Sequence, residues 1–167
     1  MFKSYFLSPI GNIIIITDYT NLCGLYFENQ KNIPNNIDEL EENNNLDIIK
    51  LIKCWLDNYF DKKNPQINTL PLKLNGSKFN QEVWKILKTI PYGQTTTYGE
   101  IAKKVAVKLN KDKMSARAVG NAVAHNPISI IIPCHRVLGK NNKITGYAGG
   151  IDKKIKLLQL ENIKFKE

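Results

Sequence analysis

The chain has 167 residues and a formal net charge of +9, from 24 Lys and Arg residues against 15 Asp and Glu residues. A chain of this length buries most of its extended surface on folding and needs no disulfide scaffold. Its three separated cysteines and two histidines have none of the spacings of a zinc site. It begins without a signal-peptide pattern and has no apolar run of membrane length. We therefore expect a cytoplasmic protein, or a nuclear one in a eukaryote, with no membrane partner and no bound metal.

The basic excess is confined to one half of the chain. Residues 1–78 contain 8 basic and 9 acidic residues, for a net charge of −1, whereas residues 79–167 contain 16 and 6, for a net charge of +10. A one-sided excess indicates a polyanionic partner, because Lys and Arg side chains that neutralise phosphates release counterions. A compositional bias towards lysine and asparagine is the alternative, but it would not spare the first half.

The first 45 residues are expected to form strands and a loop. A break at residues 8–11 precedes an apolar run at 13–17, and a polar turn separates that run from another at 22–27. This pattern predicts a β-hairpin. The asparagine-rich segment 29–45 is predicted to be a loop.

A helix and a linker are expected to complete the first half. Apolar residues recur at helical spacing over 46–60, which predicts an amphipathic helix whose aromatic residues belong to the core. Residues 64–77 contain two prolines and a glycine and are predicted to form a strand followed by a linker. The predicted domains therefore span 1–77 and 78–167.

The second half is predicted to be mostly helical. The apolar spacing and the breaks predict helices over 79–90, 98–107, 115–124 and 150–162. The second and third of these flank a lysine-rich turn, and together they resemble a helix-turn-helix. The third helix consists mainly of small residues, with Arg117 as its long side chain. Such a helix can approach nucleic acid closely, or it can pack tightly inside the domain with Arg117 at its edge.

A thiol and an imidazole follow the apolar run Ile130–Ile132, which is predicted to be a buried strand. Cys134 and His135 stand next to each other between Pro133 and Arg136. A neighbouring imidazole or cation lowers the pKa of a thiol and makes it a nucleophile. A buried cysteine that serves only as a small apolar side chain is the alternative.

Glu161 is a candidate partner for this pair. It follows Leu157 and Leu158 at helical spacing, so it lies on or beside the apolar face of the last predicted helix. A carboxylate on such a face needs a hydrogen-bond donor, and His135 is one of few candidates. Cys134, His135 and Glu161 would then act as nucleophile, base and orienting group, unless Glu161 is exposed at a frayed helix end.

These residues belong to a larger set that resembles the O6-alkylguanine-DNA alkyltransferases, also called methylated-DNA-protein-cysteine S-methyltransferases. The matching segments follow the order of that family through the second half of the chain. They are Phe79–Trp84, Ile90–Gly93 with Thr95, Tyr98–Gly99, Arg117–Gly120, Asn126–Pro127, Ile132–Val137, Gly146–Gly150, and Leu157–Leu158 with Glu161. Residues 8–11 also resemble the N-terminal segment of the family.

The resemblance implies a set of catalytic roles. Cys134 attacks the alkyl carbon on guanine O6, His135 takes the thiol proton through a water, and Glu161 holds the imidazole. Tyr98 rotates the target nucleotide and donates a hydrogen bond to guanine N3. Asn126 braces the turn that carries the cysteine.

The resemblance also implies a DNA surface and a pocket. Arg117 enters the base stack and fills the gap left by the extruded base. The other DNA-binding residues are Tyr98, Ala116, Ala118, Gly120 and Asn121. The substrate pocket is formed by Pro133, Val137, Tyr147 and Ala148, with the Ala148 N–H near O6.

The expected fold is α/β, with a ribonuclease H-like N-terminal domain and a mostly helical C-terminal domain of the winged helix-turn-helix kind. The resemblance implies a methyltransferase that acts once, without a cofactor, as a monomer on double-stranded DNA containing alkylated guanine, with O4-alkylthymine as a further possible lesion. A DNA-binding lesion sensor or regulator that does not repair is the alternative, and a cysteine hydrolase is a third hypothesis. The chain departs from the family in its longer turn at 108–114 and in Asn80, Ser129 and Ala148.

Overall fold

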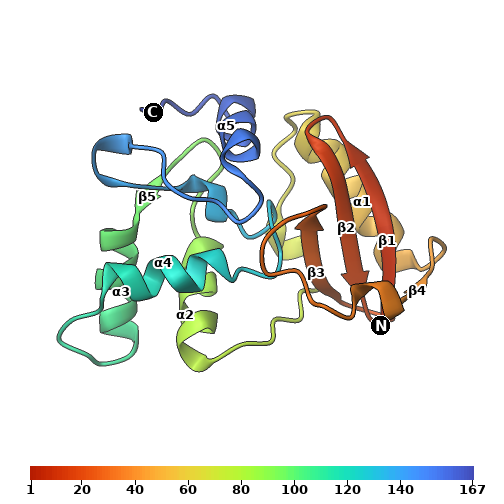
Figure 1. Cartoon of the computed structure of the whole chain (residues 1–167), viewed down its shortest axis with the longest axis horizontal. Helices are drawn as coiled ribbons and strands as arrows, with labels where there is room; N and C mark the ends of the chain where they lie inside the picture. Colours follow the sequence, from red (N-terminus) through yellow and green to blue (C-terminus); the bar gives the residue numbers. More distant parts are fainter.

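The computed structural model describes all 167 residues (Figure 1). We call residues 1–77 the N-terminal region and residues 78–167 the C-terminal region. The N-terminal region contains a four-stranded sheet and one long helix, and the C-terminal region contains four helices and a two-stranded sheet. The predicted α/β fold class is confirmed. None of the helices is long and apolar enough to cross a membrane.

The N-terminal sheet has the strand order β3-β2-β1-β4. The predicted hairpin is confirmed, because β2 and β3 pair in antiparallel register, with Ile13 opposite Phe27. The bounds are β1 Phe2–Ser8, β2 Gly11–Thr17, β3 Leu22–Phe27 and β4 Glu41–Glu42. The short strand β4 lies within the segment predicted to be a loop. Its two exposed glutamates pair with β1 through the backbone alone, so they give no apolar alternation from which to predict a strand.

Helix α1, Asp47–Phe60, contacts β1 and β2 and forms where the apolar spacing predicts it. In Figure 1 it lies behind the sheet. The strand predicted within residues 64–77 is absent. That segment contains only a 3-10 turn, Ile67–Thr69, and one isolated bridge between Leu22 and Leu72. Two prolines remove backbone donors there, which prevents a continuous ladder.

The four helices of the C-terminal region begin at or close to their predicted positions. They are α2 Lys78–Leu87, α3 Tyr98–Lys108, α4 Ala116–Ala124 and α5 Ile151–Leu160. Ser77, Thr97 and Ser115 cap the first three of them with side-chain oxygens. The short strands β5, Thr96–Thr97, and β6, Val137–Leu138, pair in parallel. They tie the start of α3 to the segment that follows Cys134.

The strand predicted at Ile130–Ile132 is wrong. The three residues are buried but form a turn, in which Ile130 has a φ of 67° and the Ile131 and Ile132 amides bond to carbonyls two and four residues earlier. Cys134–Arg136 then form a 3-10 turn, η3. A short apolar run indicates burial without fixing the backbone conformation. The turn is possible because the Asn126 side chain donates hydrogen bonds to the Ile128 and Ile132 carbonyls.

The N- and C-terminal regions share one apolar core, a cluster of 30 buried residues drawn from both. They are also joined through the backbone, because the Leu25 amide donates to the Pro127 carbonyl at 2.9 Å and the Ser129 amide donates to the Leu25 carbonyl at 2.8 Å. Strand β3 is an edge strand, and in Figure 1 it is the strand nearest the C-terminal region. The segment leading to Cys134 is therefore attached to the edge of the N-terminal sheet.

Candidate active site

Cys134 is the first residue of η3 and is 5% exposed. Its sulfur accepts a hydrogen bond from Asn126 Nδ2 at 3.1 Å. The same amide donates to the Ile132 carbonyl at 2.8 Å and the Ile128 carbonyl at 3.2 Å, and its oxygen accepts from the Ile128 amide at 3.1 Å. Asn126 therefore connects the sulfur to the turn that carries it.

Burial raises the pKa of the Cys134 thiol, although the Asn126 hydrogen bond and the positive charge of Lys154 partly offset this effect. This differs from the expectation that the adjacent imidazole lowers the thiol pKa. The His135 ring is instead bonded to Glu161 through Nε2. The resting nucleophile is therefore a thiol, and its activation requires a base that removes the proton during the reaction.

His135 is fully buried, and its Nε2 lies 2.7 Å from Glu161 Oε1. An ionised carboxylate can only accept, so Nε2 carries the hydrogen and Nδ1 keeps its lone pair. Nδ1 is buried and has no hydrogen-bond partner within the protein. Burial lowers the pKa of His135, with the charges of Arg136 and Lys154 acting in the same direction and Glu161 opposing them. The ring is therefore neutral at rest and able to accept a proton at Nδ1.

Glu161 is 3% exposed at the carboxyl end of α5, where it accepts several hydrogen bonds. Arg136 donates through Nε to Oε2 at 2.8 Å and through Nη2 to Oε1 at 3.0 Å, and the Gly93 amide donates to Oε2 at 3.2 Å. Gly93 has a φ of 76°, a conformation that favours glycine. Burial raises the pKa of Glu161, but the hydrogen bonds from His135 and Arg136 and the charge of Arg136 hold it well below the usual range. The carboxylate is ionised at neutral pH.

Three residues around this site were not predicted from the sequence to belong to it. Arg136 was noted only as a neighbour of the thiol, and Tyr59 was assigned to the core, although its hydroxyl donates to Glu161 Oε1 at 2.6 Å. Lys154 is fully buried and donates to the Val137 carbonyl at 2.7 Å. Burial lowers the pKa of Lys154 to about 8. Lys154 lies seven residues before Glu161 on the same face of α5, so helical spacing could have revealed it.

A pocket of about 30 Å³ lies beside Cys134. The Tyr98 hydroxyl is within 2.9 Å of Thr145 Oγ1, and the Tyr147 hydroxyl is buried without a partner. Pro133 and Val137 are buried and do not line this pocket. The residues that line it are Tyr98, Gly120, Val123, Ala124, Cys134, Gly146, Tyr147 and Ala148.

Helix α4 runs past the pocket and presents small residues beside it. Gly120 faces the Tyr98 ring, which lies 3.7 Å from where a Cβ atom would stand. Arg117, Ala116 and Asn121 are exposed, and Ala118 is half-buried. The Arg117 side chain makes no hydrogen bond or ion pair within the protein, so it is free to contact a partner.

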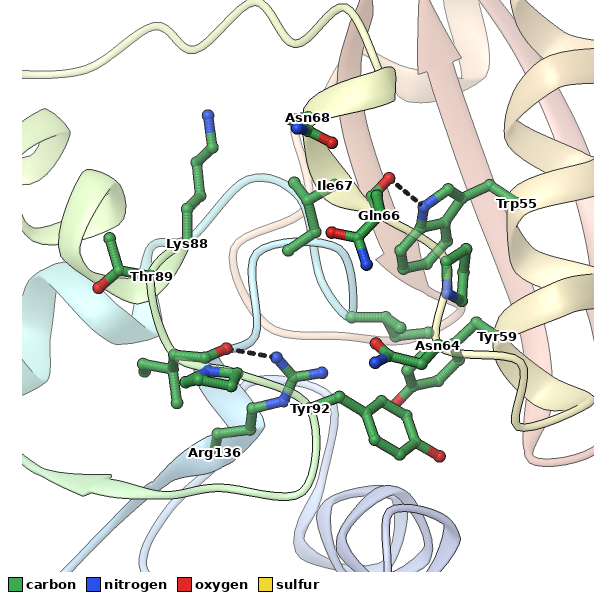
Figure 2. Close-up of a pocket in the computed structure, with 14 residues that line it drawn as sticks. Trp55, Tyr59, Asn64, Gln66, Ile67, Asn68, Lys88, Thr89, Tyr92 and Arg136 are labelled. Carbon is green, nitrogen blue, oxygen red and sulfur yellow. Dashed lines mark hydrogen bonds between the residues drawn. The ribbon is translucent and has the colours of Figure 1, made fainter.

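A larger pocket of about 270 Å³ lies between α1, the 64–68 segment and the 88–92 segment (Figure 2). Arg136 and Tyr92 lie on one side of it, and Trp55 and Tyr59 lie on the other. The Arg136 guanidinium also donates to the Ile90 carbonyl there at 2.6 Å. No group of three or more His, Cys, Asp or Glu side chains is placed to hold a metal ion.

Helices α3 and α4 pack together on either side of the predicted turn. With a buried thiol, a neutral histidine and an ionised glutamate in the same region, this arrangement is the one expected of a protein that combines DNA binding with covalent chemistry at one cysteine. Residues 78–163 match the family model described as 6-O-methylguanine DNA methyltransferase, DNA binding domain. Residues 1–74 match the ribonuclease-like domain of the same description. The chain belongs to the 6-O-methylguanine DNA methyltransferase family, as the resemblance predicted.

Relatives align along nearly the whole chain. A methylated-DNA--protein-cysteine methyltransferase of Haemophilus influenzae is 38% identical over 99% of this chain and 88% of its own length. One of Methanosarcina mazei is 41% identical over 99% of this chain and its full length. The crystal structure of Mycobacterium tuberculosis OGT in complex with DNA superposes with a TM-score of 0.84 at 37% identity, covering 96% of this chain and 92% of that one.

Proposed function

We propose that this protein repairs DNA by direct reversal, transferring a methyl or larger alkyl group from guanine O6 to Cys134. The observation that carries the proposal is the unpartnered Nδ1 of a neutral His135, whose Nε2 is held by Glu161 next to a buried thiol. The partner is double-stranded DNA containing alkylated guanine, and the protein acts as a monomer.

In the proposed reaction, His135 Nδ1 accepts the thiol proton through a water, and Glu161 stabilises the imidazolium that forms. The Sγ–carbon bond then forms as the carbon–O6 bond breaks, and the electron pair leaves with guanine. Tyr98 donates a proton or a hydrogen bond to guanine N3, since burial raises its pKa and keeps the hydroxyl protonated. Over the whole reaction, the thiol loses a proton, guanine gains a proton, and the alkyl group moves from guanine O6 to sulfur.

The base has to leave the duplex for its O6 substituent to reach Cys134, at a cost of roughly a few kcal/mol. The small residues of α4 and the free Arg117 side chain support an approach to the stack in which Arg117 fills the gap. A thioether product is stable, and no residue of the pocket is suited to cleave it. One protein molecule therefore repairs one lesion.

The test is to incubate excess duplex carrying radiolabelled O6-methylguanine with the protein and to count the label on each cysteine. We expect one label per molecule, on Cys134. Cys134→Ser should bind the lesion and take no label, whereas Cys54→Ser, which changes an exposed cysteine, should behave as wild type. Label on Cys23 or Cys54, or many turnovers as in a hydrolase, would contradict the proposal. Binding without any mass increase would favour the lesion sensor.

A further inference from the structure

Tyr59 belongs to α1 in the N-terminal region, yet its hydroxyl reaches the candidate active site. The side chain is 1% exposed, and its oxygen lies 2.6 Å from Glu161 Oε1 and 3.4 Å from His135 Nε2. Figure 2 shows it extending from α1 towards Tyr92 and Arg136. Because Nε2 already donates its hydrogen to Glu161, the tyrosine hydroxyl cannot also donate to that nitrogen. The carboxylate oxygen is therefore its acceptor.

The position of the Tyr59 ring is fixed by neighbouring aromatic residues. It stacks on Trp55 with the ring centroids 5.6 Å apart and meets the edges of Phe60 and Tyr92 at 5.3 Å and 6.1 Å. The Trp55 indole in turn donates to the Gln66 carbonyl at 3.1 Å. The packing of the N-terminal region therefore determines where the hydroxyl stands relative to Glu161.

Three donors converge on the same oxygen of Glu161, from Tyr59, His135 and Arg136. Donors that share one acceptor divide its negative charge, so each bond depends on the others. Burial and the charge of Glu161 raise the pKa of Tyr59 well above its usual value, so the hydroxyl stays protonated and keeps donating. During the reaction this donor also limits how strongly Glu161 attracts the imidazolium.

We propose that Tyr59 is a positioning residue for the alkyl transfer, through which the N-terminal region holds the Glu161 carboxylate in line with His135 and tunes its attraction for the imidazole. This inference rests on the proposed function of Cys134. It assigns a chemical contribution to a helix that the sequence places in the core. The other titratable or charged groups that act on the histidine or the glutamate are Arg136, Lys154, Tyr92 and Tyr147.

The experiment compares Tyr59→Phe with wild type in the rate of methyl transfer, from duplex and from free O6-methylguanine, between pH 5 and 9. Phenylalanine keeps the stacked ring and removes only the donor. We expect both rates to fall about tenfold, because orientation of the base is lost for either substrate. We also expect the acidic limb of the profile to move to higher pH, because Glu161 then stabilises the imidazolium more strongly.

Two control variants separate positioning from packing. Tyr92→Phe removes a neighbouring hydroxyl that donates to the Leu160 carbonyl at 3.3 Å and makes no hydrogen bond with Glu161. Trp55→Phe weakens the packing beneath Tyr59 but retains the Tyr59 hydroxyl. Tyr92→Phe should keep the wild-type pH profile, and Trp55→Phe should shift the acidic limb by less than Tyr59→Phe does. Should Tyr59→Phe unfold, 3-fluorotyrosine at position 59 retains the hydroxyl as a stronger donor and should move the acidic limb to lower pH.

The rate at which iodoacetamide alkylates Cys134, followed by peptide mass across the same pH range, distinguishes this inference from the proposed function. Wild-type protein that takes no methyl group but shows the Tyr59-dependent profile with iodoacetamide would refute the proposed function alone. A folded Tyr59→Phe protein with wild-type rates and profile in both assays would overturn the role of Tyr59. So would a shift of equal size in Trp55→Phe.

Discussion

Replacing Glu161 with Gln tests how far the fold depends on the buried carboxylate. The change keeps the shape of the side chain and removes its charge, which leaves the Arg136 guanidinium, itself 5% exposed, without its counter-charge. A glutamine also presents an NH₂ donor where every present neighbour is a donor. Removing one partner of a buried ion pair costs about 3 to 5 kcal/mol. Because a domain is stable by only about 5 to 15 kcal/mol, this is a large fraction of the total.

The assay is urea denaturation at pH 7, followed by the midpoint and slope of the unfolding transition. The matched control is Glu82→Gln, in which a half-buried glutamate loses its 2.7 Å ion pair with the exposed side chain of Lys85. We expect no measurable change in that control, because solvent screens surface pairs. If Glu161→Gln lowers the free energy of unfolding by less than about 1 kcal/mol, the reasoning is refuted, because the ion pair between Arg136 and Glu161 would then contribute no more than a solvent-exposed pair.

The same variant predicts a change in acid stability. The folded-state pKa of Glu161 is depressed, whereas in the unfolded chain a glutamate titrates near about 4.3. The stability that ionised Glu161 contributes is therefore present above about pH 4.3 and is lost as pH falls towards the folded-state pKa. Wild type should lose stability more steeply than Glu161→Gln below about pH 4. Parallel stability curves for the two proteins across that range would contradict the depressed pKa.

Two further substitutions test the DNA surface and the turn. Arg117→Ala should slow transfer from duplex by about tenfold while leaving transfer from the free base unchanged, because it affects only base extrusion. Equal slowing on both substrates would show that Arg117 acts on folding or chemistry instead. Asn126→Ala should cost about 2 to 3 kcal/mol in urea denaturation, because it leaves the Ile128 and Ile132 carbonyls short of a buried donor. The same variant should also slow the alkylation of Cys134 by iodoacetamide, because the thiol loses its hydrogen-bond donor. An unchanged alkylation rate would argue against the contact between Asn126 and Cys134.

Local patterns predicted the elements that local forces determine. The hairpin, α1 and the four C-terminal helices follow from apolar spacing, breaks and capping residues such as Thr97, which forms a capping box with Glu100. The pairing of β4 was not predicted because its partner β1 lies far away in the chain. The turn at Ile130–Ile132 was not predicted because an apolar run does not show which side chain will bond to its backbone. Asn126 stabilises that turn with side-chain hydrogen bonds that cannot be predicted from the spacing of apolar residues.

The residues of the site also divide into those that local patterns predict and those that they do not. Spacing on α5 pointed to Glu161, and it could have pointed to Lys154, but nothing in the sequence around Tyr59 indicates that its hydroxyl meets a residue 102 positions later. The direction of the Cys134 pKa was also missed. Adjacency to His135 suggested that the thiol pKa is lowered. Burial, which is a property of the whole fold, raises it instead.

The donors around Glu161 come from both regions of the chain. They come from α1, from the segment before α3, and from η3, while the carboxylate itself ends α5. A buried carboxylate left short of donors would take up a proton, and His135 would then lose the acceptor that fixes its tautomer. Nδ1 keeps its lone pair only while Nε2 is held in this way. In the proposed role of Tyr59, docking of the N-terminal helix therefore favours the reactive arrangement at Cys134, although every atom proposed to react belongs to the C-terminal region.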